Sequence, residues 1–178
     1  RFAIDADEST VLLKNENQLL PLDTKSLKSI AIIGPNADQV QFGDYTWSRN
    51  NKDGVTPLQG IKNRVNKNTA IHYAKGCSLT SLDTSGIAEA VEAAKNSEVA
   101  VIFGGSASAA LARDYKSSTC GEGFDLNDLN LTGAQSQLIR EVYRTGTPVI
   151  LVLVTGKPFV IEWEKNNLPA ILVQWYAG

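Results

Sequence analysis

Short runs of apolar residues alternate with helical stretches along most of the chain. Five runs favour β-strands, and they cover residues 29–34, 70–74, 98–105, 148–155 and 170–178. Most of them are apolar at consecutive positions, which is typical of central parallel strands that are covered on both faces. The pattern predicts an α/β fold with a mostly parallel sheet of five to six strands and helices on both faces, a three-layer α/β/α sandwich.

The segments between these runs have the apolar spacing of helices. They cover residues 56–65, 84–97, 132–146 and 158–166. In the third segment, Thr132 and Gln135 form a Thr-x-x-Gln pattern that predicts a capping box, and Gly146 predicts the helix stop. The opening residues, up to about Lys14, are predicted to form a further helix, which a polar turn closed by Pro21 follows.

Composition indicates an ordinary globular protein with a single core. The chain has 178 residues, of which 43% are hydrophobic and 20% are charged. Its net charge of -2 gives no sign of the basic face that nucleic acid or an anionic membrane would need. The longest apolar runs, VILVLV and VAVIF, are far shorter than the roughly 18 residues of a membrane span. We therefore expect neither nucleic acid nor a membrane as a partner.

The beginning of the sequence does not have the pattern of a native start. The chain contains no methionine, and it opens in mid-pattern with RFAIDADESTVLLKN. We expect it to be a piece of a longer protein. Its two cysteines, Cys77 and Cys120, match no zinc-ligand spacing, and two free thiols are favoured over one disulfide.

Two long connections interrupt the compact alternation of strands and helices. They span residues 35–55, after the first strand, and 105–130, after the third. Connections longer than about 12 to 15 residues are uncommon in compact domains unless they are functional or disordered. Both leave the carboxyl ends of strands, where open parallel sheets place their sites. We expect the functional site in these two connections.

Several common sites are disfavoured by the sequence. The turn AIIGPNAD lacks the G-x-G-x-x-G spacing of a dinucleotide site, and Pro35 removes a backbone donor that a phosphate cradle would use. There is no G-K-[ST] sequence. His72 is the single histidine and sits in a strand-like run with no G-x-S-x-G elbow elsewhere in the chain, which favours a structural role. No cofactor and no metal site are predicted.

Glu122 is the candidate that carries chemistry. It lies between two glycines, with no cation within two residues on either side. Such a carboxyl could be presented into a cleft, where burial would raise its pKa and suit it to acid–base work. A solvated loop glutamate is the alternative that the local sequence leaves open. Trp47 and Tyr45, in the other long connection, either stack on a ring or fill the loop.

Seven stretches of the chain resemble a known family. In order, they are STVLLKNENQLLPL, IAIIGPNAD, GDYT, YAKGC, GEGFD with the following L-x-L-x-G-A-Q-x-x-L-I, TPVILVLVTGKP and AILVQWYAG. Together they are similar to the second domain of family 3 glycoside hydrolases, the β-glucosidase and β-xylosidase group. The resemblance extends over residues 9–178.

The resemblance implies roles for particular residues. Glu122 matches the glutamate of the family's [S/G]-E-G-[Y/F]-D-R loop, which is the general acid/base in many members. Trp47 and Arg113 are the candidate substrate-binding residues, the latter because Arg113 and Asp114 resemble an Ala-Arg-Asp-Phe run in some relatives. One position departs from the family pattern, since Leu126 stands where the loop usually has arginine.

The resemblance also implies a domain arrangement. Residues 1–24 match the linker after an N-terminal (β/α)8 barrel that carries the nucleophilic aspartate and is absent here. Residues 25–178 match the α/β sandwich domain, cut short at its C-terminus. The expected partners are a glycoside or oligosaccharide substrate and the barrel of the same polypeptide, and the expected location is periplasmic or secreted.

The sequence thus predicts part of a retaining, exo-acting β-glycosidase that hydrolyses terminal β-linked sugars and is inactive as an isolated fragment. A non-catalytic sugar-binding or scaffolding module is the alternative. A ligand-binding α/β domain unrelated to sugars is a third hypothesis.

Overall fold

The computed structural model describes residues 8–46, 54–108, 119–121 and 127–176. Within these ranges one sheet has the strand order β1-β6-β5-β4-β2-β3. Its strands are β1 (Val11–Asn15), β2 (Ser29–Ile33), β3 (Ala70–Ala74), β4 (Val99–Gly105), β5 (Val149–Thr155) and β6 (Ala170–Trp175). Strands β2 to β6 run parallel, and β1 pairs antiparallel with β6. The predicted mostly parallel sheet is confirmed.

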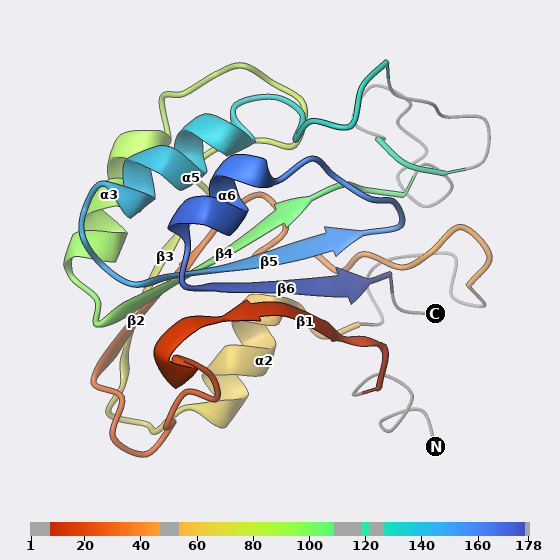
Figure 1. Cartoon of the computed structure of the whole chain (residues 1–178). Coiled ribbons are helices and arrows are strands. Elements are labelled where there is room, and N and C mark those ends of the chain that lie inside the picture. Colours follow the sequence, from red (N-terminus) through yellow and green to blue (C-terminus); the bar gives the residue numbers. More distant parts are fainter. Residues whose placement is uncertain (1–7, 47–53, 109–118, 122–126, 177–178) are drawn as a thin grey trace.

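Helices lie on both faces of this sheet, which confirms the three-layer sandwich. They are α2 (Pro57–Arg64), α3 (Ile87–Lys95), α5 (Gln135–Tyr143) and α6 (Glu162–Asn167), with a short 3-10 helix at Glu16–Gln18. Helices α3, α5 and α6 cover one face, and α2 covers the other (Figure 1). Among the described residues, no helix is both long and apolar enough to cross a membrane.

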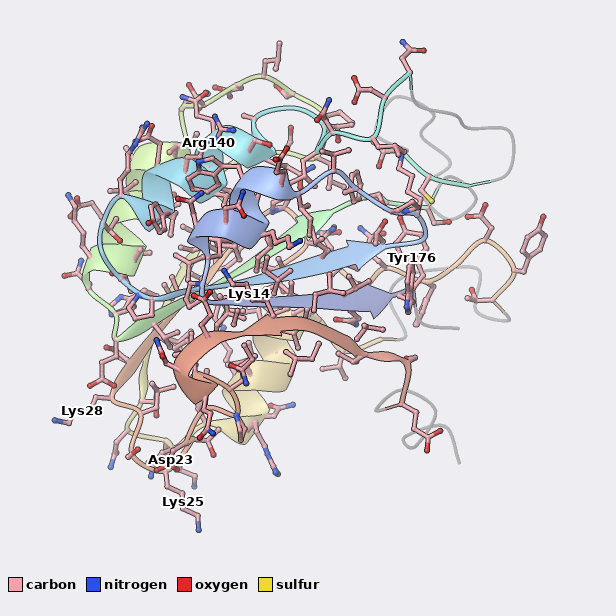
Figure 2. All side chains as sticks on the ribbon, viewed as in Figure 1. Lys14, Asp23, Lys25, Lys28, Arg140 and Tyr176 are labelled. Atoms are coloured by element: carbon pink, nitrogen blue, oxygen red, sulfur yellow. The ribbon has the colours of Figure 1, made fainter. Side chains whose placement is uncertain are left out.

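The core has two parts because the sheet is covered twice. One cluster fills the space under α3, α5 and α6, and the other lies between the sheet and α2. All seven residues of β4 and all seven of β5 are buried, as their continuous apolar runs predicted. At the edge of the core, Trp163 of α6 packs edge-on against Tyr143. The guanidinium carbon of Arg140 lies 5.1 Å from the centre of the Trp163 ring, and Figure 2 labels Arg140.

The N-terminal segment differs from the prediction, since residues 11–15 form a strand and not the end of a helix. The pairing joins Val11 to Val173 and Asn15 to Ala170. Without β1, the outer edge of β6 would present unpaired backbone N–H and C=O groups. Pairing with that edge therefore outweighs the local helical preference of leucine and lysine. The predicted polar turn follows, where the Asn15 amide bonds both the N–H and the C=O of Leu20.

The order of the strands creates a switch point between β2 and β4. From β2 the chain moves outward through α2 to β3, and it then returns through α3 on the other face to place β4 on the opposite side of β2. The connections that leave β2 and β4 therefore depart to opposite faces of the sheet. Open α/β sheets characteristically bind ligands in the crevice outside such a point.

Both strands at the switch point end in a glycine that the geometry requires. Gly34 has φ 113° and Gly105 has φ 116°, in the left-handed region that glycine tolerates. A Cβ added to Gly34 would lie 2.3 Å from the carbonyl oxygen of Phe103, and one added to Gly105 would lie 2.2 Å from that of Val154. The chain thus leaves both strands in close contact with the neighbouring backbone.

We predict that Gly105→Ala destabilises the fold far more than Gly146→Ala. Both glycines have positive φ, so each alanine costs about 1 kcal/mol of backbone strain. A Cβ at Gly146 meets nothing within 4 Å, whereas at Gly105 it collides with the β5 backbone, which adds about 1–3 kcal/mol or more. Urea denaturation of the chain measures both changes. Equal losses in the two variants would contradict the close-approach argument.

Candidate functional site

The carboxyl ends of the central strands are joined by a buried polar network, and Asn36 lies at its centre. This side chain is 0% exposed and follows β2 by three residues. Its Nδ2 donates to the carbonyl oxygens of Gly104 and Ser106, each at 3.2 Å, and its Oδ1 accepts from Gln41 at 2.9 Å. Asn36 therefore ties the connection after β2 to the connection after β4.

A chain of hydroxyl groups continues the network from β4 to β5 and β6. Thr155 Oγ1 donates to the carbonyl oxygen of Lys157 at 2.8 Å, and it accepts from Ser106 Oγ at 2.9 Å. Because each hydroxyl has one proton, Tyr176 must be the donor in its 2.6 Å contact with Ser106 Oγ. Figure 2 shows Tyr176 at this end of the sheet and Lys28 at the opposite end.

Two parts of the connection after β4, residues 106–108 and residues 119–121, lie side by side and are joined by hydrogen bonds. Thr119 and Cys120 both donate their N–H groups to the carbonyl oxygen of Ala107, at 3.1 and 3.2 Å. In return, the Ala107 N–H donates to Thr119 Oγ1 at 3.1 Å. Ser108 forms a parallel bridge with Cys120. We call residues 106–108 and 119–121 the loop neck.

Besides the bond from Asn36 to Ser106, the other long connection contacts the loop neck at Ser108. Ser108 is 2% exposed, and its hydroxyl donates to the carboxylate of Asp44. Asp44 belongs to the connection that leaves β2, on the other side of the switch point. The two connections that the sequence singled out are therefore held together at the carboxyl edge of the sheet, as expected.

Gln135 has a different role from the one predicted. It is the first residue of α5, but the residue that caps this helix is Ala134, and no side chain makes a cap hydrogen bond there. The Gln135 side chain is 1% exposed and bonds both the N–H and the C=O of Gly105, at 2.8 and 3.0 Å. Thr132 donates to the carbonyl oxygen of Leu79 at 2.6 Å. The capping box is wrong because both side chains satisfy buried backbone groups elsewhere, at strand and loop ends.

Comparison with known proteins decides the family of the chain. The family model described as the glycosyl hydrolase family 3 C-terminal domain matches residues 10–178. The chain belongs to glycosyl hydrolase family 3. The resemblance seen in the sequence is thereby confirmed over almost the whole length.

Curated relatives of this family 3 domain are glycosidases that are about four times as long. The chain is 41% identical to a β-xylosidase of Formosa agariphila over 99% of its own length and 24% of that protein. It is 36% identical to a periplasmic β-glucosidase of Salmonella typhimurium, over 97% of the chain and 24% of the relative. The chain therefore spans about a quarter of the length of these relatives.

Solved structures of glycosidases agree with the fold. A β-glucosidase of Listeria innocua in complex with glucose matches with a TM-score of 0.81 and 26% identity, over 98% of this chain and 22% of that one. The exo-β-xylosidase XlnD matches with a TM-score of 0.80 and 29% identity, over 97% of this chain and 21% of that one. The sandwich of this domain is thus a common component of larger enzymes.

The predicted site residues Glu122, Trp47 and Arg113 lie outside the described residues, as does Leu126. The chain is placed directly before Trp47 and Glu122 and directly after Leu126, at Thr46, Gly121 and Asn127. Gly121, directly before Glu122, has φ 135° and ends the loop neck. Tyr45 is 84% exposed within the other connection, so it does not fill the loop.

The remaining candidates of the sequence have structural positions. Cys77 and Cys120 are free and buried, which confirms the prediction of two thiols. Burial raises the pKa of Cys77 to about 11, and a thiol held protonated in this way is a poor nucleophile. His72 lies in the edge strand β3, opposite Ala31 of β2. Among the described residues, no group of three His, Cys, Asp or Glu side chains could hold a metal ion.

Sequence reasoning missed the residues that organise this edge of the sheet. Most of them are hydroxyl or amide side chains, and Ser106 and Ser108 lie in the stretch GGSAS directly after a buried strand. Their partners are distant in sequence, so no local pattern identifies the pairs. The missed residues are Asn36, Asp44, Ser106, Ser108, Thr119, Gln135, Thr155 and Tyr176.

We predict that Tyr176 makes the stability of the chain fall at alkaline pH. Burial raises the pKa of its phenol above the ordinary value of 10.0, and the contact with Ser106 offsets only part of that rise. Above pH 10 the unfolded tyrosine ionises while the folded one stays protonated, so the free energy of unfolding decreases as pH rises. Tyr176→Phe removes the contribution of this phenol to the dependence.

Urea denaturation of the wild type and Tyr176→Phe between pH 7 and about 11 measures the effect. The wild type should be more stable by about 1 kcal/mol at pH 7, because its hydroxyl bonds Ser106. This difference should shrink above pH 10. A difference that stays constant would show that the phenol is not protected from ionisation.

Proposed function

We propose that the chain is the second domain of a retaining, exo-acting β-glycosidase, and that Glu122 is its general acid/base. The observation that carries this proposal is the position of the loop neck. Glu122 follows Gly121 directly, and the neck lies at the switch point where α/β sheets place their sites. The stretch GEGFD also resembles the family's acid/base loop, and the 41% identical relative is a β-xylosidase.

The chemistry of retention requires two carboxyl groups about 5–5.5 Å apart. One attacks the anomeric carbon and forms a glycosyl-enzyme, while the other donates its proton to the departing oxygen. That second group then takes a proton from water as the water attacks the intermediate. On this proposal Glu122 is the second group, and the nucleophilic aspartate comes from a (β/α)8 barrel of the same polypeptide.

The acid must be protonated before the glycosidic bond breaks. A solvated glutamate has a pKa of about 4.3, which would leave it ionised at neutral pH. Packing of the loop against the barrel and the substrate would remove water from Glu122 and raise its pKa. This dependence on a second domain explains why we expect the isolated chain to be inactive.

The names of relatives support the class of substrate and the location. Relatives with 36–41% identity include a β-xylosidase and a β-glucosidase, so terminal β-linked sugars in glycosides or oligosaccharides are the proposed substrates. The Salmonella relative is a periplasmic enzyme. We infer a periplasmic or secreted location for the full protein on the same ground.

We predict that Glu122→Ala in the full-length enzyme affects substrates according to their leaving group. General acid catalysis contributes about 10²- to 10⁴-fold, so turnover of an alkyl glycoside should fall by that factor. An activated aryl glycoside needs no protonation of its leaving group and should form the glycosyl-enzyme at nearly the normal rate. Added azide should restore turnover, because it attacks the intermediate without a base.

Asp128→Ala is the matched control, since Asp128 is an exposed carboxylate in the same connection that accepts a hydrogen bond from the nearby Asn130 N–H. It should leave the ratio of the two activities unchanged. Equal loss on both substrates in Glu122→Ala, or no loss, would rule out the acid/base role. Unaltered sugar binding by an inactive full-length protein would instead favour the sugar-binding module.

A further inference from the structure

We propose that Thr119 and Ser108 are positioning residues that set the orientation of Glu122 by closing the loop neck, with Asp44 as the anchor on the other connection. The inference rests on the proposed function, because it concerns the same acid/base residue. It goes beyond it by assigning a catalytic consequence to three residues that do not contact the reacting atoms.

Thr119 makes two of the hydrogen bonds that close the neck. It is 2% exposed and lies three residues before Glu122 in the sequence. Its N–H donates to Ala107 O and its Oγ1 accepts from Ala107 N, each at 3.1 Å, so both polar groups of Ala107 face the same partner. With the hydroxyl removed, the Ala107 N–H would be a buried donor without an acceptor, which native proteins avoid. Opening of the neck would then let water reach the Ala107 N–H.

Ser108 and Asp44 join the neck to the other long connection. The acceptor is a carboxylate, and hydrogen bonds to ionised acceptors are about twice as strong as neutral ones. Asp44 stands 64 residues away in the sequence, in the connection that leaves β2 toward the opposite face. The pair therefore links the neck to the other side of the switch point, and not only to its own strand.

Gly156 and Tyr176 lie close to Cys120 of the loop neck. A Cβ added to Gly156 would lie 3.1 Å from the Cys120 sulfur and 2.9 Å from Tyr176 Cε2, so the three residues are packed together after β5. Tyr176 is itself held by Ser106. The backbone that precedes Glu122 is thus bound to Ala107, linked through Ser108 to Asp44 and packed against Tyr176.

Such a closure matters for catalysis because proton donation is sensitive to position. A general acid has to come within about 2.6–3.2 Å of the oxygen that it protonates. A misplacement of about 1 Å by a change away from the chemistry can cost on the order of 10²-fold in rate. The loss should fall on the step that needs the acid, and a substrate with a good leaving group should be spared.

The test compares Thr119→Val with Thr119→Ser in the full-length enzyme. Valine keeps the shape of threonine but has no acceptor, whereas serine keeps the acceptor. Thr69→Val is the matched control, because Thr69 is a threonine 9% exposed at the start of β3 whose hydroxyl bonds Leu27 O at 2.8 Å. It lies at the amino end of the sheet, far from the neck.

For Thr119→Val, kcat/KM on an alkyl glycoside, which reports formation of the glycosyl-enzyme, should fall about 10- to 100-fold, while kcat/KM on an activated aryl glycoside should change by less than about threefold. Thr119→Ser should restore the ratio of the two activities. Thr69→Val should leave that ratio at the wild-type value, even if it lowers the melting temperature as much as Thr119→Val does.

A ratio in Thr119→Val that equals the ratio in Thr69→Val would overturn the proposal. Glu122→Ala, assayed beside them, separates the two hypotheses. If Glu122→Ala shows selective loss and Thr119→Val does not, the acid/base role stands and the positioning role fails. If Glu122→Ala shows no selective loss, both fail.

Ser108→Ala provides a second measurement in case Thr119→Val does not fold. It removes one hydroxyl and leaves the hydrogen bonds between Thr119 and Ala107 in place. The ratio of alkyl to aryl activity should fall about 3- to 10-fold, since one of the two links is lost. An unchanged ratio in a folded Ser108→Ala enzyme would contradict the proposal on its own.

Discussion

Buried backbone groups that lose their ladder partners at the ends of parallel strands are the constraint on which this structure depends. All the parallel strands end at one edge, and the chain must leave that edge while its N–H and C=O groups are still out of reach of water. Asn36, Thr119, Gln135 and Thr155 supply the missing partners, and none of them is more than 2% exposed. Their hydrogen bonds fix the direction in which each connection leaves, so the polar network defines the edge as firmly as the apolar core defines the layers.

The strand order makes this edge the expected place for a ligand-binding site. With β2 and β4 adjacent and their connections departing to opposite faces, the two long connections start side by side, and Ser108 joins one to the other at Asp44. Strands β4 and β5 are buried along their whole length, which gives this edge of the sheet a rigid base. A rigid base with irregular connections is the usual way for a fold to position chemistry, because loops on a fixed scaffold can vary without loss of the core.

The parts of the fold that could be predicted are those that depend on local sequence patterns. Continuous apolar runs identified the five parallel strands, since a strand covered on both faces has no polar side. Strand β1 could not be predicted, because its conformation depends on the free edge of β6, which lies far away in the sequence. Val11 pairs with Val173, 162 residues later, and Asn15 pairs with Ala170, 155 residues later. Thr132 and Gln135 matched a capping pattern, yet their partners are Leu79 and Gly105. The roles of Glu122 and Arg113 came from family resemblance and that of Trp47 from its aromatic side chain in a long connection, and all three stay predictions.

The strength of the loop neck can be compared with the catalytic effect that it is proposed to support. Four hydrogen bonds hold it in the described residues, those of Thr119, Cys120 and Ala107 and that of Ser108 with Asp44. At about 0.5–1.5 kcal/mol each, they sum to about 2–6 kcal/mol, which would keep the open neck below about 3% of molecules. General acid catalysis of about 10²- to 10⁴-fold corresponds to about 3–5 kcal/mol. The two energies are of the same order, so the closed neck is strong enough to keep the backbone before Glu122 in one position.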